Sequence, residues 1–274
     1  MPIVELTLES ARVAAKFKMD NMGGLDYVIE LATRSGLAGY ERPYPEFMAQ
    51  ALQHLKGCFL DVGANTGLYA LLAAAARPNV QVHAFEPLPA ISDILSRNVG
   101  LNPSIEPRIR VHRIALSDRT GKATFYETIN PYGLFSTSSG LNEAFSRKQG
   151  ETRRHEVPTI TADQWCAQNG VTEIAFMKID VEGFEREVIA GSQNVIATQR
   201  PVIGLELLGD ADFEYFSHFI KRHSYIDCTL TPGRLQFGTR PIFVPDGWNH
   251  VFLPSERRDL ALRIAELLSL DVQA

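Results

Sequence analysis

The chain has 274 residues, of which 45% are hydrophobic and 22% charged, so it can bury a core that offsets chain entropy and is not intrinsically disordered. Its net charge of −5 argues against nucleic acid as a partner, since that needs a basic surface. Three dispersed cysteines without a C-x-x-C pair exclude a disulfide framework and a zinc knuckle. The longest apolar run, 68–76, is far shorter than the roughly 20 residues that span a bilayer, and the acidic start lacks a signal-peptide core. We therefore expect a cytoplasmic protein without a membrane span.

The N-terminal segment, 1–56, shows no strand pattern that we recognise. Within it, 45–55 repeats apolar residues at helical spacing. We predict that 1–56 is a helical extension that caps a substrate site.

From residue 57 to residue 274, short β-branched or aromatic runs alternate with helical patterns. Strands are predicted at 58–62, 80–85, 109–116, 174–179, 201–207, 225–230 and 251–253, and helices at 68–76, 89–99, 161–170, 185–195 and 212–222. This alternation is typical of an α/β domain with a mostly parallel sheet and helices on both faces. The polar stretch 130–150 is predicted to be an insertion on the substrate side.

A buried strand, a glycine turn and a helix follow one another in FLDVGANTG. Such a turn brings backbone N–H groups and a helix N-terminus to a ligand. Dinucleotide sites need G-x-G-x-x-G, but Asn65 stands where the middle glycine would be, between Gly63 and Gly67, which disfavours a pyrophosphate. Asp61 would repel a diphosphate and suits the ammonium of S-adenosylmethionine. We predict a cofactor cradle of Asp61, Gly63, Ala64, Asn65 and Gly67; the alternative is a turn whose glycines are purely geometric.

Two further strand ends carry side chains suited to a nucleoside. Glu86, followed by Pro87, ends the second predicted strand, where a carboxylate can accept from both ribose hydroxyls of NAD or of S-adenosylmethionine. Ser117 and Asp118 follow the third strand, where the adenine amino group would lie. Taken singly, Glu86 could be an ordinary surface residue, and Ser117 and Asp118 could belong to an ordinary turn.

Five motifs occur in a distinctive order along the chain: DVGANTGLY at 61–69, FEP at 85–87, ALSD at 115–118, KIDVEGFE at 178–185 and RPVIGLELL at 200–208. Together they resemble the FkbM family of S-adenosylmethionine-dependent methyltransferases. The resemblance spans about 58–210, with a weaker similarity in NHVFLP at 249–254. It implies a Rossmann-like class I methyltransferase fold with a seven-stranded sheet whose last strand is antiparallel. It also implies methyl transfer to an oxygen, usually a hydroxyl of a sugar, glycolipid or polyketide-type product.

Methyl transfer to an alcohol needs a group that removes the hydroxyl proton. Asp180 and Glu182 follow the fourth predicted strand, and extended geometry would place both on one face, where repulsion raises one pKa. Their alternative role is capping of the next helix by Asp180, with Glu182 solvated. Asp180 is also predicted to contact the cofactor. His155 is a further candidate base, as is His250.

Lys178 lies inside an apolar strand and needs a partner, for which Glu206 is the candidate unless it is a further site carboxylate. Asp180, Glu182 and Glu206 could also hold a divalent metal, an option that we do not favour. The predicted acceptor-binding residues are Ser136, Ser138, Asn142, Glu206 and Asn249. The loop that carries the serines could equally be mobile without a binding role.

The leading hypothesis is an S-adenosylmethionine-dependent O-methyltransferase that acts on a hydroxyl of a carbohydrate, glycolipid or hydroxylated natural product. An NAD-dependent oxidoreductase is the first alternative, and it requires the glycine that Asn65 replaces. A non-catalytic methyltransferase-like binding module is the second, although a decayed site would tend to lose Asp61, Glu86 and Asp180. The expected partner is a small-molecule or glycan acceptor, and a homo-oligomer is compatible with each reading.

Overall fold

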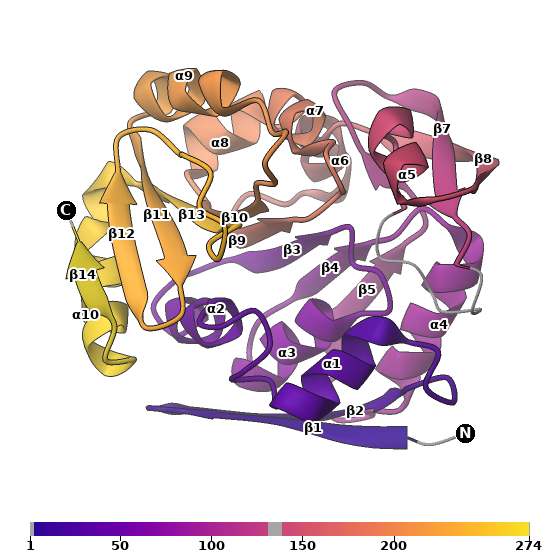
Figure 1. Ribbon diagram of the computed structural model, residues 1–274, viewed down its shortest axis with the longest axis horizontal. Coiled ribbons are helices and arrows are strands. Elements are labelled where there is room, and N and C mark those ends of the chain that lie inside the picture. Colours follow the sequence, from indigo (N-terminus) through magenta and orange to yellow (C-terminus); the bar gives the residue numbers. More distant parts are fainter. Residues whose placement is uncertain (1–2, 131–138, 274) are drawn as a thin grey trace.

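A nine-stranded sheet forms the centre of the computed structural model, which describes residues 3–130 and 139–273 (Figure 1). Its order is β14-β12-β11-β13-β10-β9-β3-β4-β5. The bounds are β3 (Cys58–Val62), β4 (Val82–Phe85), β5 (Ile109–His112), β9 (Ile174–Ile179), β10 (Val202–Glu206), β11 (Tyr225–Thr231), β12 (Arg234–Gly238), β13 (Asn249–Pro254) and β14 (Asp271–Gln273). Neighbours from β5 to β10 are parallel, and β13 is antiparallel to β10 and to β11. The α/β class and the antiparallel last strand of the expected seven are confirmed.

The sheet is wider than the predicted seven strands, because β12 and β14 extend it beyond β11. Thr231 and Arg234 pair across a two-residue turn of Pro232 and Gly233, whose φ is 78°. Proline followed by glycine suits such a turn, since proline presets its own φ and glycine accepts a positive one. No strand is predicted from the sequence between 231 and 249, so β12 is an addition to the expected sheet.

Helices cover both faces of the sheet, as predicted (Figure 1). Phe176 enters the core with α2, α3, α4 and α10, whereas Met177, the next residue of β9, enters the core with α6, α7, α8 and α9. The two directions follow from the period of two along a strand. The helices are α1 (Tyr27–Ser35), α2 (Tyr44–Leu52), α3 (Leu68–Ala76), α4 (Pro89–Gly100), α5 (Glu143–Gln149), α6 (Ala162–Asn169), α7 (Glu185–Ala190), α8 (Gln193–Gln199), α9 (Phe213–His223) and α10 (Arg258–Leu267), with short 3-10 turns at Glu106–Arg108 and Ser255–Arg257.

The N-terminal segment begins with an antiparallel hairpin of β1 (Ile3–Ser10) and β2 (Val13–Asp20). The prediction of a helical extension over 1–56 is therefore wrong for this hairpin, although α1 and α2 confirm helices in the rest. Apolar and polar residues alternate along both strands, so that Leu8 and Phe17 are buried while their neighbours are exposed. The hairpin packs through β2 on α3 and lies outside the central sheet (Figure 1).

A small second sheet accompanies the predicted insertion. Its order is β6-β8-β7, with β6 (Ala115–Leu116), β7 (Gly121–Thr128) and β8 (Thr152–Ile160). The single strand predicted at 109–116 is split, because β5 stays in the central sheet and β6 pairs with β8. Helix α5 lies within the stretch predicted as an insertion, whose central part, 131–138, lies outside the described residues. No helix in the described part of the chain combines the length and apolarity that crossing a membrane requires.

Candidate active site

A cavity of about 690 Å³ lies at the carboxyl ends of the parallel strands. Its wall includes the glycine turn after β3, the end of β4, the residues after β9 and the end of β10. The small sheet, α1 and residues 39–41 complete the wall. This edge is where open α/β sheets bind ligands, and the volume is typical of a small-molecule site.

The glycine turn packs tightly against the end of β9. Gly63 has a φ of 79°, and a Cβ at this position would lie 1.9 Å from the carbonyl oxygen of Asp180, so no other residue fits there. Asn65 has a φ of 48°, a conformation that asparagine tolerates better than most residues. Gly63, Ala64 and Asn65 line the cavity, whereas Gly67 shapes the start of α3 behind the wall.

Glu86 lies beside this turn and lines the cavity together with Pro87. Its carboxylate accepts hydrogen bonds from the backbone N–H groups of Asn65, at 3.1 Å, and Leu88, at 2.9 Å. Burial raises the pKa of Glu86 to about 7, although these hydrogen bonds oppose the rise. The carboxylate is therefore held firmly at the cavity wall.

Asp61 is fully buried and does not belong to the described lining of the cavity. Neither oxygen accepts a hydrogen bond of ordinary length and angle from the described residues. Burial raises the pKa of Asp61 to about 6, and the ammonium of Lys178 opposes the rise. The structure thus places Asp61 beneath the wall, where its carboxyl group interacts electrostatically with Lys178 and Asp180.

Ser117 is buried and Asp118 is exposed, and neither belongs to the described lining of the cavity, whereas Ala115 and Leu116 of β6 do. The Ser117 hydroxyl donates to Asp118 at 3.0 Å, and Asp118 pairs with Arg119 at 3.5 Å. The structure therefore does not bring the two predicted adenine contacts to the described cavity surface.

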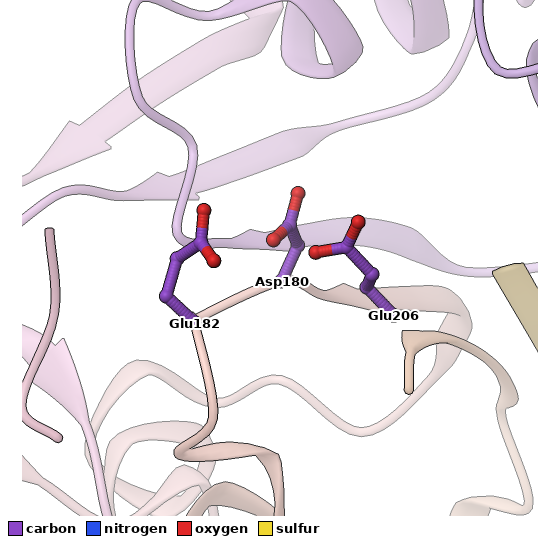
Figure 2. Close-up of side chains that lie close together, drawn as sticks. All are labelled: Asp180, Glu182 and Glu206. Carbon is purple, nitrogen blue, oxygen red and sulfur yellow. The ribbon is translucent and has the colours of Figure 1, made fainter. Parts of the chain in front are cut away.

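Asp180, Glu182 and Glu206 converge, with one carboxylate oxygen of each lying within 4.8 Å of the others (Figure 2). All three line the cavity. Glu182 has a φ of 57°, so the chain bends after β9 and does not continue as the extended segment that we expected. The convergence arises because this bend and the end of β10 direct the side chains toward the same point. Three carboxylates at this distance are also a donor set that could hold a divalent cation.

Burial and mutual repulsion alter the charge of this cluster. Burial, together with the charges of Asp180 and Glu185, raises the pKa of Glu182 to about 9, although the ammonium of Lys178 opposes the rise. Burial and the charge of Asp180 likewise raise the pKa of Glu206 well above its ordinary value. Glu185, which the sequence did not single out, accepts from the backbone N–H groups of Val181, at 3.1 Å, and Gly183, at 3.2 Å. Glu185 thus holds the turn between β9 and α7, and among the described residues no side chain caps α7, so Asp180 does not have the capping role considered for it.

Lys178 is paired with Asp180, at 2.9 Å, and not with Glu206. Its ammonium also lies 4.7 Å from the centre of the Tyr69 ring. Burial lowers the pKa of Lys178, but the carboxylates of Asp180, Asp61 and Glu41 raise it by more, so that it lies above its ordinary value. A permanent positive charge is thus embedded next to the carboxylate cluster.

Glu41 is a cavity residue that the sequence analysis missed. It accepts a hydrogen bond of 2.5 Å from the hydroxyl of Tyr69. Glu41 precedes α2 in the N-terminal segment, where no motif marks it and where only its place in the fold brings it to the strand ends.

The remaining predicted residues on the side of the small sheet lie outside the described lining. His155 bonds Glu127 at 2.7 Å, and it is Glu127, with Arg153, that lines the cavity. Asn142 begins α5 and donates to the carbonyl oxygen of Gly183 at 2.9 Å, so it ties the insertion to the turn after β9. Ser136 and Ser138 lie outside the described residues.

On the side of β13, Asn249 pairs in register with Glu206 but is buried away from the described cavity surface. His250 is fully buried, and its Nδ1 lies 2.9 Å from a carboxylate oxygen of Asp227. Trp248, which precedes them, lines the cavity. Trp248 thus lines the cavity where the sequence analysis predicts an acceptor contact by Asn249.

Comparison with known proteins agrees with the motifs. The model of the methyltransferase FkbM domain matches residues 61–227, more than half of the chain. The 31-O-demethyl-FK506 methyltransferase FkbM of Streptomyces tacrolimicus is 30% identical over 157 residues, which cover 49% of this chain and 58% of that protein. The 2-O-methyltransferase NoeI of Sinorhizobium fredii is 28% identical over 152 residues, which cover 52% and 59%.

A longer match joins the chain to part of a much larger protein. The AMB antimetabolite synthetase AmbE of Pseudomonas aeruginosa is 28% identical over 200 residues, which cover 61% of this chain and 9% of that protein. The chain thus spans less than two thirds of the length of each of these relatives. Among solved structures, methyltransferase FkbM from Methylobacillus flagellatus KT has a TM-score of 0.48 and 14% identity, with 72% of this chain and 43% of that chain covered.

Proposed function

The chain belongs to the FkbM family of methyltransferases, and from this premise we propose that it methylates a hydroxyl oxygen of a carbohydrate, glycolipid or hydroxylated natural product, with S-adenosylmethionine as the donor. The observation that carries the proposal is the convergence of three carboxylates beside the glycine turn in one cavity. The names of two relatives support oxygen as the acceptor atom, since NoeI is a 2-O-methyltransferase and FkbM acts on 31-O-demethyl-FK506.

The residues of the glycine turn and of the end of β4 fit this donor. Gly63, Ala64 and Asn65 would lie against the donor, although the N–H groups of Gly63 and Ala64 both donate to the carbonyl oxygen of Phe85 and are not free for its carboxylate. Glu86 would accept from its ribose hydroxyls. The fit is supported by Glu86, a buried carboxylate that is held at the cavity wall by two backbone donors. When bound, the donor supplies a methyl group on a positively charged sulfur.

The carboxylate cluster has two tasks toward the acceptor. Asp180, paired with Lys178, carries the negative charge of the cluster and takes the proton from the acceptor hydroxyl. Glu182 keeps its proton at neutral pH, because its pKa is raised to about 9, and it donates a hydrogen bond that orients the acceptor. The pKa of Glu206 is raised in the same direction, and Glu206 lies on the other side of the acceptor hydroxyl. Trp248, Phe184 and Tyr40 line the same cavity and would exclude water from the reacting atoms.

Incubation with S-adenosylmethionine labelled in its methyl group tests the proposal directly. A panel of glycans, glycolipids and hydroxylated natural products serves as acceptors, and we expect label in an alkali-stable methyl ether. Label on nitrogen or carbon would refute the assignment of the acceptor atom. In parallel calorimetry, binding of NADH without binding of S-adenosylhomocysteine would favour an oxidoreductase, and binding of neither would favour a non-catalytic module.

A further inference from the structure

Glu41 reaches the cavity from a part of the chain that the family match, 61–227, does not include. Its backbone has a φ of 47°, a strained conformation for a residue with a side chain, and its carbonyl oxygen accepts from the N–H of Tyr44 at 2.9 Å as α2 begins. Strained backbone of this kind persists where the surrounding structure holds it, and it is concentrated at functional sites. The fold thus keeps Glu41 in the wall of the cavity at a cost in conformational energy.

The side chain of Glu41 is fixed to the glycine turn by Tyr69. Tyr69 lies in the first turn of α3, directly after the glycine turn, and its hydroxyl donates to Glu41 at 2.5 Å. The Tyr69 ring is in turn held edge-on by Tyr44, with 5.5 Å between ring centres, and it lies under the ammonium of Lys178. Glu41 therefore belongs to the end of the cavity where α3 begins, which is the end that would receive the amino-acid part of the donor.

That end of the cavity needs a carboxylate for a cationic ligand, and Asp61 cannot reach it directly. Asp61 lies beneath the described wall, whereas Glu41 and Asp180 belong to the wall itself. Lys178 already occupies one oxygen of Asp180. Burial and the charge of Asp180 raise the pKa of Glu41, although hydrogen bonds from Tyr40 and Tyr69 and the charge of Lys178 oppose the rise. A further cation beside Glu41 would favour its charged form.

We propose that Glu41 binds the ammonium group of the methionine part of S-adenosylmethionine, and that the N-terminal segment thereby completes the donor site. This inference rests on the proposed function. It replaces Asp61 as the direct partner of the ammonium, and it gives the segment before β3 a task besides covering the acceptor.

The test compares two ligands that differ only in the amino group. S-adenosylhomocysteine and its deamino analogue are titrated calorimetrically into the wild-type chain, Glu41→Gln and Tyr69→Phe. We expect Glu41→Gln to bind S-adenosylhomocysteine about 10- to 100-fold more weakly, as for loss of a charged hydrogen bond, and to bind the deamino analogue as the wild type does. Tyr69→Phe removes one of the two tyrosine hydrogen bonds to Glu41 and should show a smaller loss that is again confined to the ligand with the amino group.

Glu46→Gln is the matched control, because Glu46 follows in α2 and is not part of the described cavity wall, and it should bind both ligands normally. Unchanged affinity of Glu41→Gln for S-adenosylhomocysteine would overturn the inference, as would equal weakening of both ligands, which would indicate a merely structural role. Absence of binding to the wild type would instead overturn the proposed donor. The two failures are therefore distinguishable.

Discussion

Replacing Glu182 by glutamine should stabilise the folded protein while it is free of ligands. The pKa of Glu182 is raised from 4.5 to about 9, mainly by burial. As the pH rises above 4.5, the unfolded chain loses this proton before the folded chain does, so the free energy of unfolding falls until the pH reaches about 9. Glutamine cannot ionise in either state and avoids this loss. The stabilisation by Glu182→Gln should therefore increase with pH.

The size of the effect follows from the pKa values. Each pH unit between 5 and 8 would cost at most about 1.4 kcal/mol, or about 4 kcal/mol over three units. Three neighbouring carboxylates share the protons, and Glu182 retains some contact with solvent, so the expected gain is about 1–2 kcal/mol at pH 8. For a chain of this size, that gain corresponds to a rise in Tm of roughly 2–4 °C.

Denaturant unfolding of the wild type and of Glu182→Gln, at pH 5 and at pH 8, measures the gain. Glu9→Gln, an exposed substitution on β1, is the control and should change stability at neither pH. A gain of equal size at both pH values would refute the assignment of a proton to Glu182, and so would destabilisation at pH 8. The result also bears on mechanism, since a protonated Glu182 donates a hydrogen bond and does not act as the base.

Three further predictions concern turnover and donor binding. Asp180→Asn should lower kcat by about 10²- to 10⁴-fold in the labelled-methyl assay, whereas Glu182→Gln keeps a neutral donor and should retain most activity; a fully active Asp180→Asn would remove Asp180 as the base. Glu86→Gln should weaken binding of S-adenosylhomocysteine about tenfold or more in calorimetry, with kcat at saturating donor little changed, and equal affinities would exclude a ribose contact. Treatment with EDTA should leave kcat unchanged, because the roles proposed for the three clustered carboxyls, proton removal and orientation of the acceptor, need no metal; loss of activity that Mg²⁺ restores would show that the cluster holds a cation.

The local pattern of apolar and polar residues predicted the core of the fold, because each strand and helix there has a recognisable pattern within a few consecutive residues. Buried strands such as Ile174–Ile179 are nearly continuous apolar runs, and the glycine turn is identified by the spacing of its glycines in the sequence. The alternation of apolar and polar residues in Ile3–Ser10 and Val13–Asp20 is a local strand signal that the sequence analysis missed, and the hairpin gains further support from packing on α3. Such support lies far along the chain and is invisible locally.

The residues of the candidate site likewise include some that the sequence could predict and some that it could not. Asp180, Glu182 and Glu206 stand at strand ends, and their meeting followed from the parallel sheet. Asp61 also stands at a strand end, but its side chain points beneath the wall, and one residue of shift along a strand decides that direction. Glu41 became visible only in three dimensions, because a turn before α2 carries it across the sheet edge to Tyr69.

The most direct test of the central claim is a crystal structure of the chain with S-adenosylhomocysteine. We expect the ribose on Glu86 and the sulfur pointing toward the space between Asp180, Glu182 and Glu206. A ligand whose sulfur faces away from these carboxylates, or one that lies outside this cavity, would contradict methyl transfer at this site.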